Sequence, residues 1–180
     1  MKRMIHSIMA LAAVLGALAT TTAPAARAEE MPAKFKIGDA APDFTLQEIG
    51  GRKIQLSKTY KDKVVLLAFW SLRCGACLSE APFLEQIHKG YGGKGVAVLS
   101  VVTDGVDAAT TKSVMKEVGI SPSYPVLMDP DFSASDTYTN FVVPHTLVID
   151  RKGVIRYVHT GFEKDTEKQY EAALKLALAP

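Results

Sequence analysis

The stretch "KVVLLAFWSLRCGACLSEAPFLEQIHK", residues 63–89, decides the fold class, because it joins a buried strand to a helix through a pair of cysteines. Residues 63–70 are an apolar run with β-branched and aromatic side chains that is too short for a typical helix, which predicts a buried strand. From Cys74 onward, apolar side chains recur at helical spacing on one face, which predicts a helix that Pro82 should kink. Cys74 and Cys77, the only cysteines of the chain, therefore lie where the strand ends and the helix begins.

Other patterns continue this alternation of strands and helices. Two short alternating runs on either side of Gly50-Gly51 predict a β-hairpin. Apolar runs predict strands at 95–104, 124–129, 146–150 and 154–160, and helical patterns lie at 107–118, 131–138 and 163–177. The sequence thus predicts an α/β fold whose sheet has a parallel part and an antiparallel edge.

Residues 1–28 predict an export signal that is cleaved after Ala28. A basic start, an apolar run and a small-residue cleavage site follow one another: Lys2 and Arg3, Ile8–Ala19, and Ala26-Arg27-Ala28. Because the run is shorter than the ~20 residues that cross a bilayer, a retained membrane anchor is the weaker alternative. Residues 29–35 are then a lead-in, and 36–180 form one domain.

The charge balance argues against a nucleic-acid surface. The full chain carries a net charge of +2, but the export signal holds three of the 21 Lys and Arg residues and none of the 19 Asp and Glu residues. The remaining 18 basic and 19 acidic residues give about −1, without runs of like charge. Export would place the protein in the periplasm, an oxidising compartment where a disulfide persists.

The cysteine pair has two structural alternatives, a staple and a zinc site. A bridge between Cys74 and Cys77 closes a ring of four residues, which constrains the unfolded chain by only ~2 kcal/mol. A structural zinc ion needs about four ligands, and the other candidates are His88, His145 and His159, which lie on separate predicted elements. Neither alternative explains why the two cysteines are separated by only two residues at the start of a helix.

A redox pair uses this spacing directly. At the N-terminus of a helix, the backbone N–H groups and the helix dipole stabilise a Cys74 thiolate and make it the attacking sulfur. Cys77, one turn further along, is placed to attack a mixed disulfide on Cys74 and to release the substrate. Gly75 and Ala76 are small and leave the Cys74 sulfur open to a protein partner. The context therefore favours thiol-disulfide exchange.

Several motifs together resemble the exported TlpA/ResA group of thiol-disulfide oxidoreductases, which have the thioredoxin-like fold and fall within the redoxin (AhpC/TSA) group. These motifs are "APDFTL", "FW" followed by "CGAC", then Glu80 and Pro82, and "VPHTLVIDRKG", and the resemblance covers about residues 36–178. It implies a central mixed sheet flanked by helices, with an N-terminal β-hairpin. It also implies that Trp70 packs beside the cysteines and that the Val143-Pro144 bond is cis. The loop with this bond would face the disulfide, and the main-chain groups of Val143 would pair with an extended segment of the substrate.

Three residues depart from the pattern of the group, namely Arg73, Ala76 and His145. Arg73 stands where a Trp usually precedes the first cysteine, and it should help to hold a thiolate on Cys74. His145 stands where a small or β-branched residue usually follows the cis-proline. A charged His145 imidazolium near Cys74 would favour the thiolate, so we expect His145 to influence the reduction potential and the choice of partner.

Glu80 lies three residues after Cys77 and hence on the same helix face. The resemblance implies that this glutamate is partly buried and tunes the cysteine pair. Ordinary thioredoxins instead bury an aspartate on the preceding strand, where this chain has Ala68. Glu80 is therefore our candidate for moving a proton to or from Cys77. His88 and His159 match no partner, and we predict that both are surface residues.

The resemblance further implies a protein disulfide reductase that is a monomer and has no cofactor beyond its redox-active disulfide. Its electron donor would be a membrane thiol carrier of the DsbD or CcdA kind, and its substrates would be oxidised proteins such as apocytochrome c or a copper-site assembly factor. Electrons could also flow in the opposite direction, which would make the protein a strong oxidant, because Val143 before the proline also resembles DsbA-type enzymes.

Two further functions remain as alternatives. The first is a copper chaperone that binds Cu(I) through Cys74, Cys77 and His145, although copper proteins of the Sco kind carry a spacing one residue longer. The second is a peroxidase, whose Pro-x-x-x-Thr-x-x-Cys pattern is absent because Leu67 stands where the proline is needed.

Overall fold

The structure is a computed structural model that describes residues 34–179, so the predicted export signal lies outside the described residues. The strands are β1 (Thr45–Glu48), β2 (Lys53–Gln55), β3 (Val64–Trp70), β4 (Val96–Val102), β5 (Val126–Met128), β6 (His145–Ile149) and β7 (Ile155–Thr160). The helices are α1 (Leu56–Tyr60), α2 (Gly75–Tyr91), α3 (Ala108–Glu117), α4 (Ser133–Tyr138) and α5 (Thr166–Leu178), with a short 3-10 helix at Gly92–Lys94.

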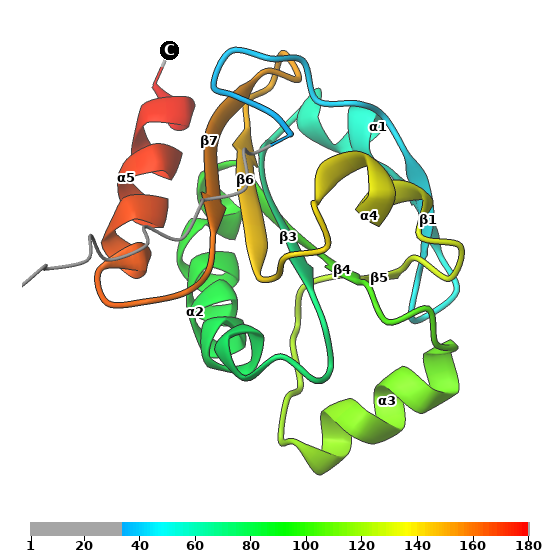
Figure 1. The fold of residues 1–180 in the computed structure, drawn as a ribbon. Coiled ribbons are helices and arrows are strands. Elements are labelled where there is room, and N and C mark those ends of the chain that lie inside the picture. Colours follow the sequence, from blue (N-terminus) through cyan, green and yellow to red (C-terminus); the bar gives the residue numbers. More distant parts are fainter. Residues whose placement is uncertain (1–33, 180) are drawn as a thin grey trace, which may run out of the picture. The chain divides into compact units, whose positions relative to one another are not determined.

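The strands form one seven-stranded sheet in the order β2-β1-β5-β4-β3-β6-β7 (Figure 1). Strand β4 runs parallel to both of its neighbours, β3 and β5, and every other neighbouring pair is antiparallel. The predicted α/β sheet with a parallel part is confirmed. It has an antiparallel edge at each end, because the β1–β2 hairpin joins β5 and the β6–β7 hairpin joins β3.

Helices cover both faces of the sheet, α2 and α5 on one face and α1 and α4 on the other (Figure 1). All seven residues of β3 are buried, which explains why its sequence is continuously apolar rather than alternating. Leu66 packs in the cluster that holds side chains of α2 and α5, and Leu67 packs in the cluster on the opposite face. Burying one leucine side chain contributes about 2 kcal/mol, so β3 stabilises both layers.

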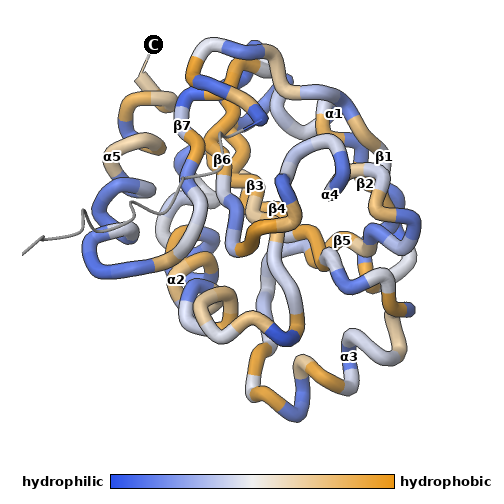
Figure 2. The backbone as a smooth tube through the Cα atoms, viewed as in Figure 1, coloured by the Kyte–Doolittle hydropathy of each residue, from blue (hydrophilic) through white to orange (hydrophobic). Residues whose placement is uncertain are grey.

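The hydropathy of the backbone follows this layering. In Figure 2 the tube is orange along much of the central strands, whereas α5 alternates between orange and blue along its length. The buried positions of α5 include Tyr170, Ala173 and Leu174, which recur at helical spacing and face the sheet.

Three details differ from the sequence-based expectations or add to them. The single turn of α1 was not predicted, because five residues are too few to show a helical period. Helix α5 begins at Thr166, three residues later than expected, after Asp165 in the left-handed region at φ 74°. Helix α2 continues through Pro82 to Tyr91. Among residues 34–179, none of the helices combines the length and the apolar character needed to span a bilayer.

Candidate functional site

The two cysteines form a disulfide at the start of α2. Cys74 is the N-cap residue of the helix, and its sulfur accepts a hydrogen bond from the backbone N–H of Cys77 at 3.2 Å. Cys77 is 1% exposed, whereas Cys74 is half-buried and is followed by the exposed residues Gly75 and Ala76. The disulfide is therefore reached from solvent on its Cys74 side, next to N–H groups that stabilise a thiolate.

Asp104 fixes the loop that leads from β3 to Cys74. One of its carboxylate oxygens accepts a hydrogen bond from the Ser71 hydroxyl and the other accepts one from the Leu72 N–H, each at 2.8 Å. The Ser71 hydroxyl oxygen in turn accepts from the Arg73 N–H at 3.2 Å. Asp104 was not among the predicted site residues. It follows the end of a strand parallel to β3, and that position was the available signal, because parallel strands end at one edge of a sheet.

The Val143-Pro144 peptide bond is cis, as the resemblance implies. The Val143 carbonyl oxygen lies 3.6 Å from the Cys74 sulfur. Val143 also lines a pocket whose apolar side is formed with Phe132 and Phe141 and whose polar side includes Ser71 and Thr103. Phe141 is 78% exposed and Phe132 is 39% exposed, and both have backbone conformations in the left-handed region. An apolar surface thus adjoins the accessible sulfur.

Trp70 is the last residue of β3, as predicted, and Arg73 directly precedes Cys74 in the loop after it. Trp70 is 5% exposed and belongs to the same apolar cluster as Cys77, so it packs in the core and also beside the sulfurs. Arg73 is exposed. The cluster also contains Leu72, Val102, Met115 and Val126, and it shields the inner cysteine from water.

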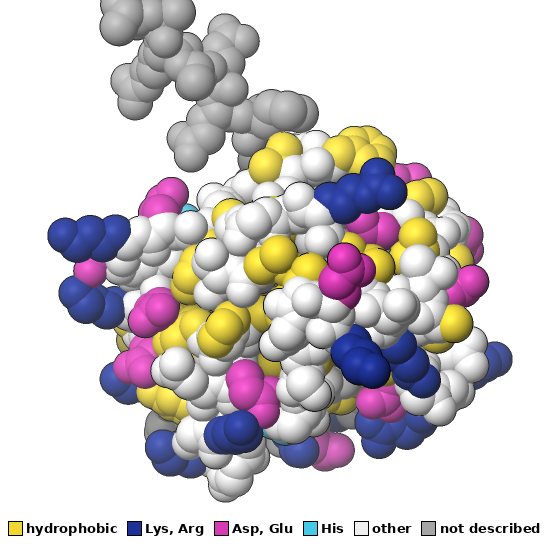
Figure 3. Space-filling model, turned by 90° about the horizontal axis from the view of Figure 1, so that it is seen from below, with side chains coloured by type: hydrophobic (Ala, Val, Ile, Leu, Met, Phe, Trp, Pro, Cys, Tyr) yellow, Lys and Arg dark blue, Asp and Glu magenta, His cyan; other side chains and the backbone are white. Residues whose placement is uncertain are grey.

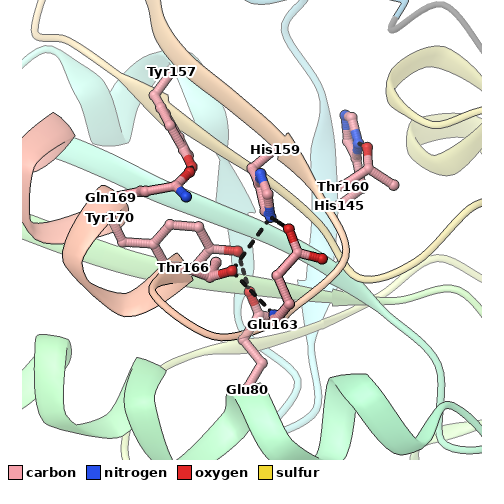
Figure 4. Close-up of polar contacts among 9 residues, drawn as sticks. All are labelled: Glu80, His145, Tyr157, His159, Thr160, Glu163, Thr166, Gln169 and Tyr170. Atoms are coloured by element: carbon pink, nitrogen blue, oxygen red, sulfur yellow. Dashed lines mark hydrogen bonds and ion pairs between the residues drawn. The ribbon is translucent and has the colours of Figure 1, made fainter. Parts of the chain in front are cut away.

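Glu80 is fully buried on α2, one turn after Cys77. Its Oε1 accepts hydrogen bonds from the Thr146 hydroxyl at 2.8 Å and from the Tyr170 hydroxyl at 2.7 Å, and Figure 4 shows Glu80 meeting Tyr170. Burial raises the pKa of the Glu80 carboxyl to about 7, although the two donated hydrogen bonds lower it. A carboxyl group with this pKa can exchange a proton near neutral pH.

The register of the sheet explains why this carboxyl group fits here. Thr146 of β6 pairs with Ala68 of β3, so both side chains point to the face covered by α2 and α5. Ala68 is too small to fill the space above it, and Glu80 and Tyr170 reach into this layer from the two helices. The acidic group thus comes from the helix instead of the strand. Thr146 and Tyr170 were not predicted as site residues, because no local spacing links them to Glu80.

His145 lies on the opposite face of the sheet. Successive side chains of a strand alternate, and because Thr146 faces Glu80, His145 faces away from it. Its Nδ1 lies 2.8 Å from the Thr160 hydroxyl, and Figure 4 shows this pair apart from Glu80 and Tyr170. Burial lowers the pKa of His145 to about 4, with a smaller contribution from His159. His145 is therefore neutral near pH 6, and the expectation that its positive charge favours the thiolate is corrected.

His88 and His159, the other two histidines within residues 34–179, are half-buried, so the prediction that they are surface residues is wrong. The ring of His88 packs edge-on against Tyr124, and its Nδ1 is buried. The side chain of His159 is 17% exposed and packs against Tyr170. Within residues 34–179, no group of three or more His, Cys, Asp and Glu side chains is arranged to hold a metal ion. The copper alternative therefore lacks a third ligand in this part of the chain.

Comparisons with known proteins agree with this geometry. The Redoxin family model matches residues 36–174. Thiol-disulfide oxidoreductase ResA of Bacillus thuringiensis subsp. konkukian is 32% identical over 142 residues, which are 79% of this chain and 79% of the relative. ResA of Bacillus subtilis is 32% identical over 124 residues, 69% of this chain and 67% of the relative.

A solved structure from Chlorobium tepidum, assigned as a thiol:disulfide interchange protein DsbE, matches with a TM-score of 0.73 and 28% identity, covering 80% of this chain and 99% of that one. This match shows that the sheet and helices of the two proteins share the thioredoxin-like arrangement. The chain therefore belongs to the redoxin family and, within it, to the ResA-like thiol-disulfide oxidoreductases.

Proposed function

We propose that this thiol-disulfide oxidoreductase is an exported reductant that passes electrons from the Cys74–Cys77 pair to oxidised proteins. The observation that carries the proposal is the asymmetry of the pair: Cys74 is half-buried at a helix N-terminus, whereas Cys77 is 1% exposed. This asymmetry supports different roles for the two sulfurs, attack by the outer one and resolution by the inner one.

In the first step, the Cys74 thiolate of the reduced protein attacks one sulfur of the substrate disulfide. A bond forms between the Cys74 sulfur and that sulfur, and the substrate S–S bond breaks. The other substrate sulfur leaves as a thiolate and takes a proton from solvent. The helix N-terminus lowers the cost of forming the attacking thiolate.

In the second step, the Cys77 thiol gives its proton to the Glu80 carboxylate, and its sulfur attacks Cys74. The Cys74–Cys77 bond forms as the bond between Cys74 and the substrate sulfur breaks, and that substrate sulfur leaves as a thiolate that is then protonated. Two electrons have moved from the cysteine pair to the substrate. Glu80 suits this role because its raised pKa, about 7, lets it accept and return a proton at neutral pH.

The surface around Cys74 supports a protein substrate. The Val143 carbonyl group, 3.6 Å from the Cys74 sulfur, is placed to pair with an extended segment of the substrate, and the exposed Phe141 offers an apolar contact beside it. On the face shown in Figure 3, basic and acidic side chains are interspersed with apolar atoms, which does not favour nucleic acid. The substrate would be held by main-chain and apolar contacts next to its disulfide.

The finer assignment rests on the resemblance and on relatives named ResA and DsbE. The substrates would be apocytochrome c or a copper-site assembly factor, and a membrane thiol carrier of the DsbD or CcdA kind would return two electrons to the pair. The protein would work in the periplasm as a monomer, with no cofactor beyond the disulfide. Residues 1–28 would direct export and then be removed.

Trapping of mixed disulfides in the periplasm tests this proposal. A Cys77→Ala variant keeps the attacking sulfur but cannot resolve the intermediate, so substrates should remain bound to Cys74 until a reductant is added. Mass spectrometry of the released proteins should identify an apocytochrome or a copper-site factor. The matched control is the Cys74→Ala, Cys77→Ala double variant. If the single variant traps no more protein than this control, the proposed substrate role is wrong.

A further inference from the structure

Two hydroxyl groups converge on the same oxygen of Glu80. Thr146 of β6 and Tyr170 of α5 both donate to Oε1, at 2.8 Å and 2.7 Å. The other oxygen, Oε2, is buried and has no hydrogen-bond partner among the described residues. Buried polar atoms usually have a partner, so this difference between the two oxygens of one carboxyl group requires an explanation.

Packing fixes the direction of both donors. The ring of Tyr170 lies against the rings of Phe83, Tyr157, His159 and Phe162, with centroid distances between 5.8 and 6.5 Å. Burial raises the pKa of Tyr170 beyond its usual range, so its hydroxyl keeps its proton. Thr146 is held by pairing of β6 with β3 on one side and with β7 on the other. Both residues are therefore held in place beside Oε1 by the surrounding structure.

The proton of a neutral Glu80 is then restricted to one atom. If it were on Oε1, that oxygen would become a hydroxyl oxygen, which accepts the two donated hydrogen bonds less well than a carbonyl oxygen does. We propose that Tyr170 and Thr146 are positioning residues that keep Glu80 Oε1 as an acceptor and leave Oε2 as the atom that gives and takes the proton. The inference rests on the proposed proton-transfer role of Glu80. Oε2, which has no hydrogen-bond partner among the described residues, is open to a proton in the disulfide form and to the Cys77 thiol of the reduced protein during exchange.

Few titratable groups act on Glu80 besides the cysteine pair. Tyr170 faces it from α5, Tyr124 interacts with it electrostatically from the segment before β5, and Cys77 precedes it by one turn of α2. His159 of β7 lies beside Tyr170 rather than in a hydrogen bond with Glu80. None of the ion pairs formed by residues 34–179 includes Glu80. The two hydroxyl groups are therefore its strongest local polar contacts.

Infrared difference spectroscopy of the oxidised protein tests the inference, because it reads the protonated carboxyl group without any substrate. The Glu80 band is identified by its loss in Glu80→Gln. If Oε1 is the C=O oxygen, Tyr170→Phe and Thr146→Val each remove a donor to it. We expect the band to move to higher wavenumber and the titration midpoint to rise by roughly one pH unit in each variant. Both substitutions keep the shape of the side chain, so either can carry the test if the other folds poorly.

Tyr157→Phe is the matched control, because it removes a hydroxyl from the same aromatic cluster. That hydroxyl donates to Gln169 at 2.7 Å and not to Glu80, so the band and the midpoint should stay unchanged. A band that does not move in Tyr170→Phe and Thr146→Val would place the proton on Oε1 and overturn the inference. The proposed function is measured separately, as the rate at which the reduced wild-type protein reduces a protein disulfide. If the protein failed to reduce the disulfide, the infrared measurement on the oxidised protein would still show which oxygen of Glu80 carries the proton.

Discussion

Glu80 is a carboxyl group inside an apolar layer, and this placement links the stability of the fold to pH. Its pKa is raised from 4.5 to about 7 in the folded protein, so the folded state favours the neutral form. Stability from this group is fully present below about pH 4.5 and is lost as pH rises through about 7. We predict that Glu80→Gln becomes more stable than the wild type as pH rises across this window, by at most about 3 kcal/mol. Urea unfolding of the oxidised proteins at pH 4.5, 6 and 8 measures the difference. An equal difference at all three values would contradict a raised pKa.

The same substitution should slow catalysis without harming the fold. Glutamine keeps the shape of Glu80 but cannot accept the proton of Cys77, so exchange should slow by roughly 10²-fold or more, the size of a typical general-base contribution. The rate profile should also lose its inflection near pH 7, where the carboxyl group titrates. Stopped-flow reduction of a protein disulfide between pH 5 and 9 measures both effects. A profile unchanged in shape would remove Glu80 from the proton transfer.

The charge of His145 was predicted wrongly from the sequence alone. Because burial lowers its pKa to about 4, it carries no charge between pH 6 and 8. We therefore predict that any change in reduction potential caused by His145→Thr is the same at pH 6 and pH 7.5, since no imidazolium is lost. Equilibration with glutathione at the two pH values measures this. A shift in potential that is larger at pH 6 would show that the histidine titrates in this range and would restore the electrostatic role first expected of it.

At the scale of elements, the loop between β3 and α2 depends on Asp104, which binds Ser71 and Leu72 through both carboxylate oxygens. Removing these acceptors leaves a partly buried hydroxyl and an N–H group without their partners. Asp104→Ala should therefore lower the free energy of unfolding by about 1–3 kcal/mol. Urea unfolding measures this effect, with Asp62→Ala at an exposed position as the control. Equal stability of the two variants would show that Asp104 does not hold the loop.

The elements themselves were predictable to different degrees. The strands β3 and β4 and the helix α2 follow from apolar patterns within each segment, which depend only on local spacing. The cis bond at Pro144 came from the family resemblance, because most X-Pro bonds are trans. The partners of Glu80 could not be found in this way. Thr146 and Tyr170 lie 66 and 90 positions away from it in the chain, and only tertiary packing brings them to one oxygen.

For the molecule as a whole, the cysteine bridge contributes little to folding compared with the two apolar layers around β3. The ring closed by Cys74 and Cys77 has a sequence separation of three, and the corresponding entropic contribution is about 2 kcal/mol. We predict that the Cys74→Ser, Cys77→Ser double variant folds fully and loses about that amount of stability relative to the oxidised wild type. Circular dichroism and thermal unfolding measure both quantities. A double variant that does not fold would mean that the bridge is a structural staple.

The two sulfurs are assigned different roles, and the pH dependence of alkylation tests these roles directly. On the reduced wild-type protein, iodoacetamide labelling followed by mass spectrometry gives a separate rate for each cysteine. Cys74 should react first, with a midpoint below the ~8.5 of a free thiol, because it is accessible and caps α2. Cys77 should react much more slowly, because it is buried behind Trp70 and Val102. Faster labelling of Cys77 than of Cys74 would contradict the assignment of Cys74 as the attacking sulfur.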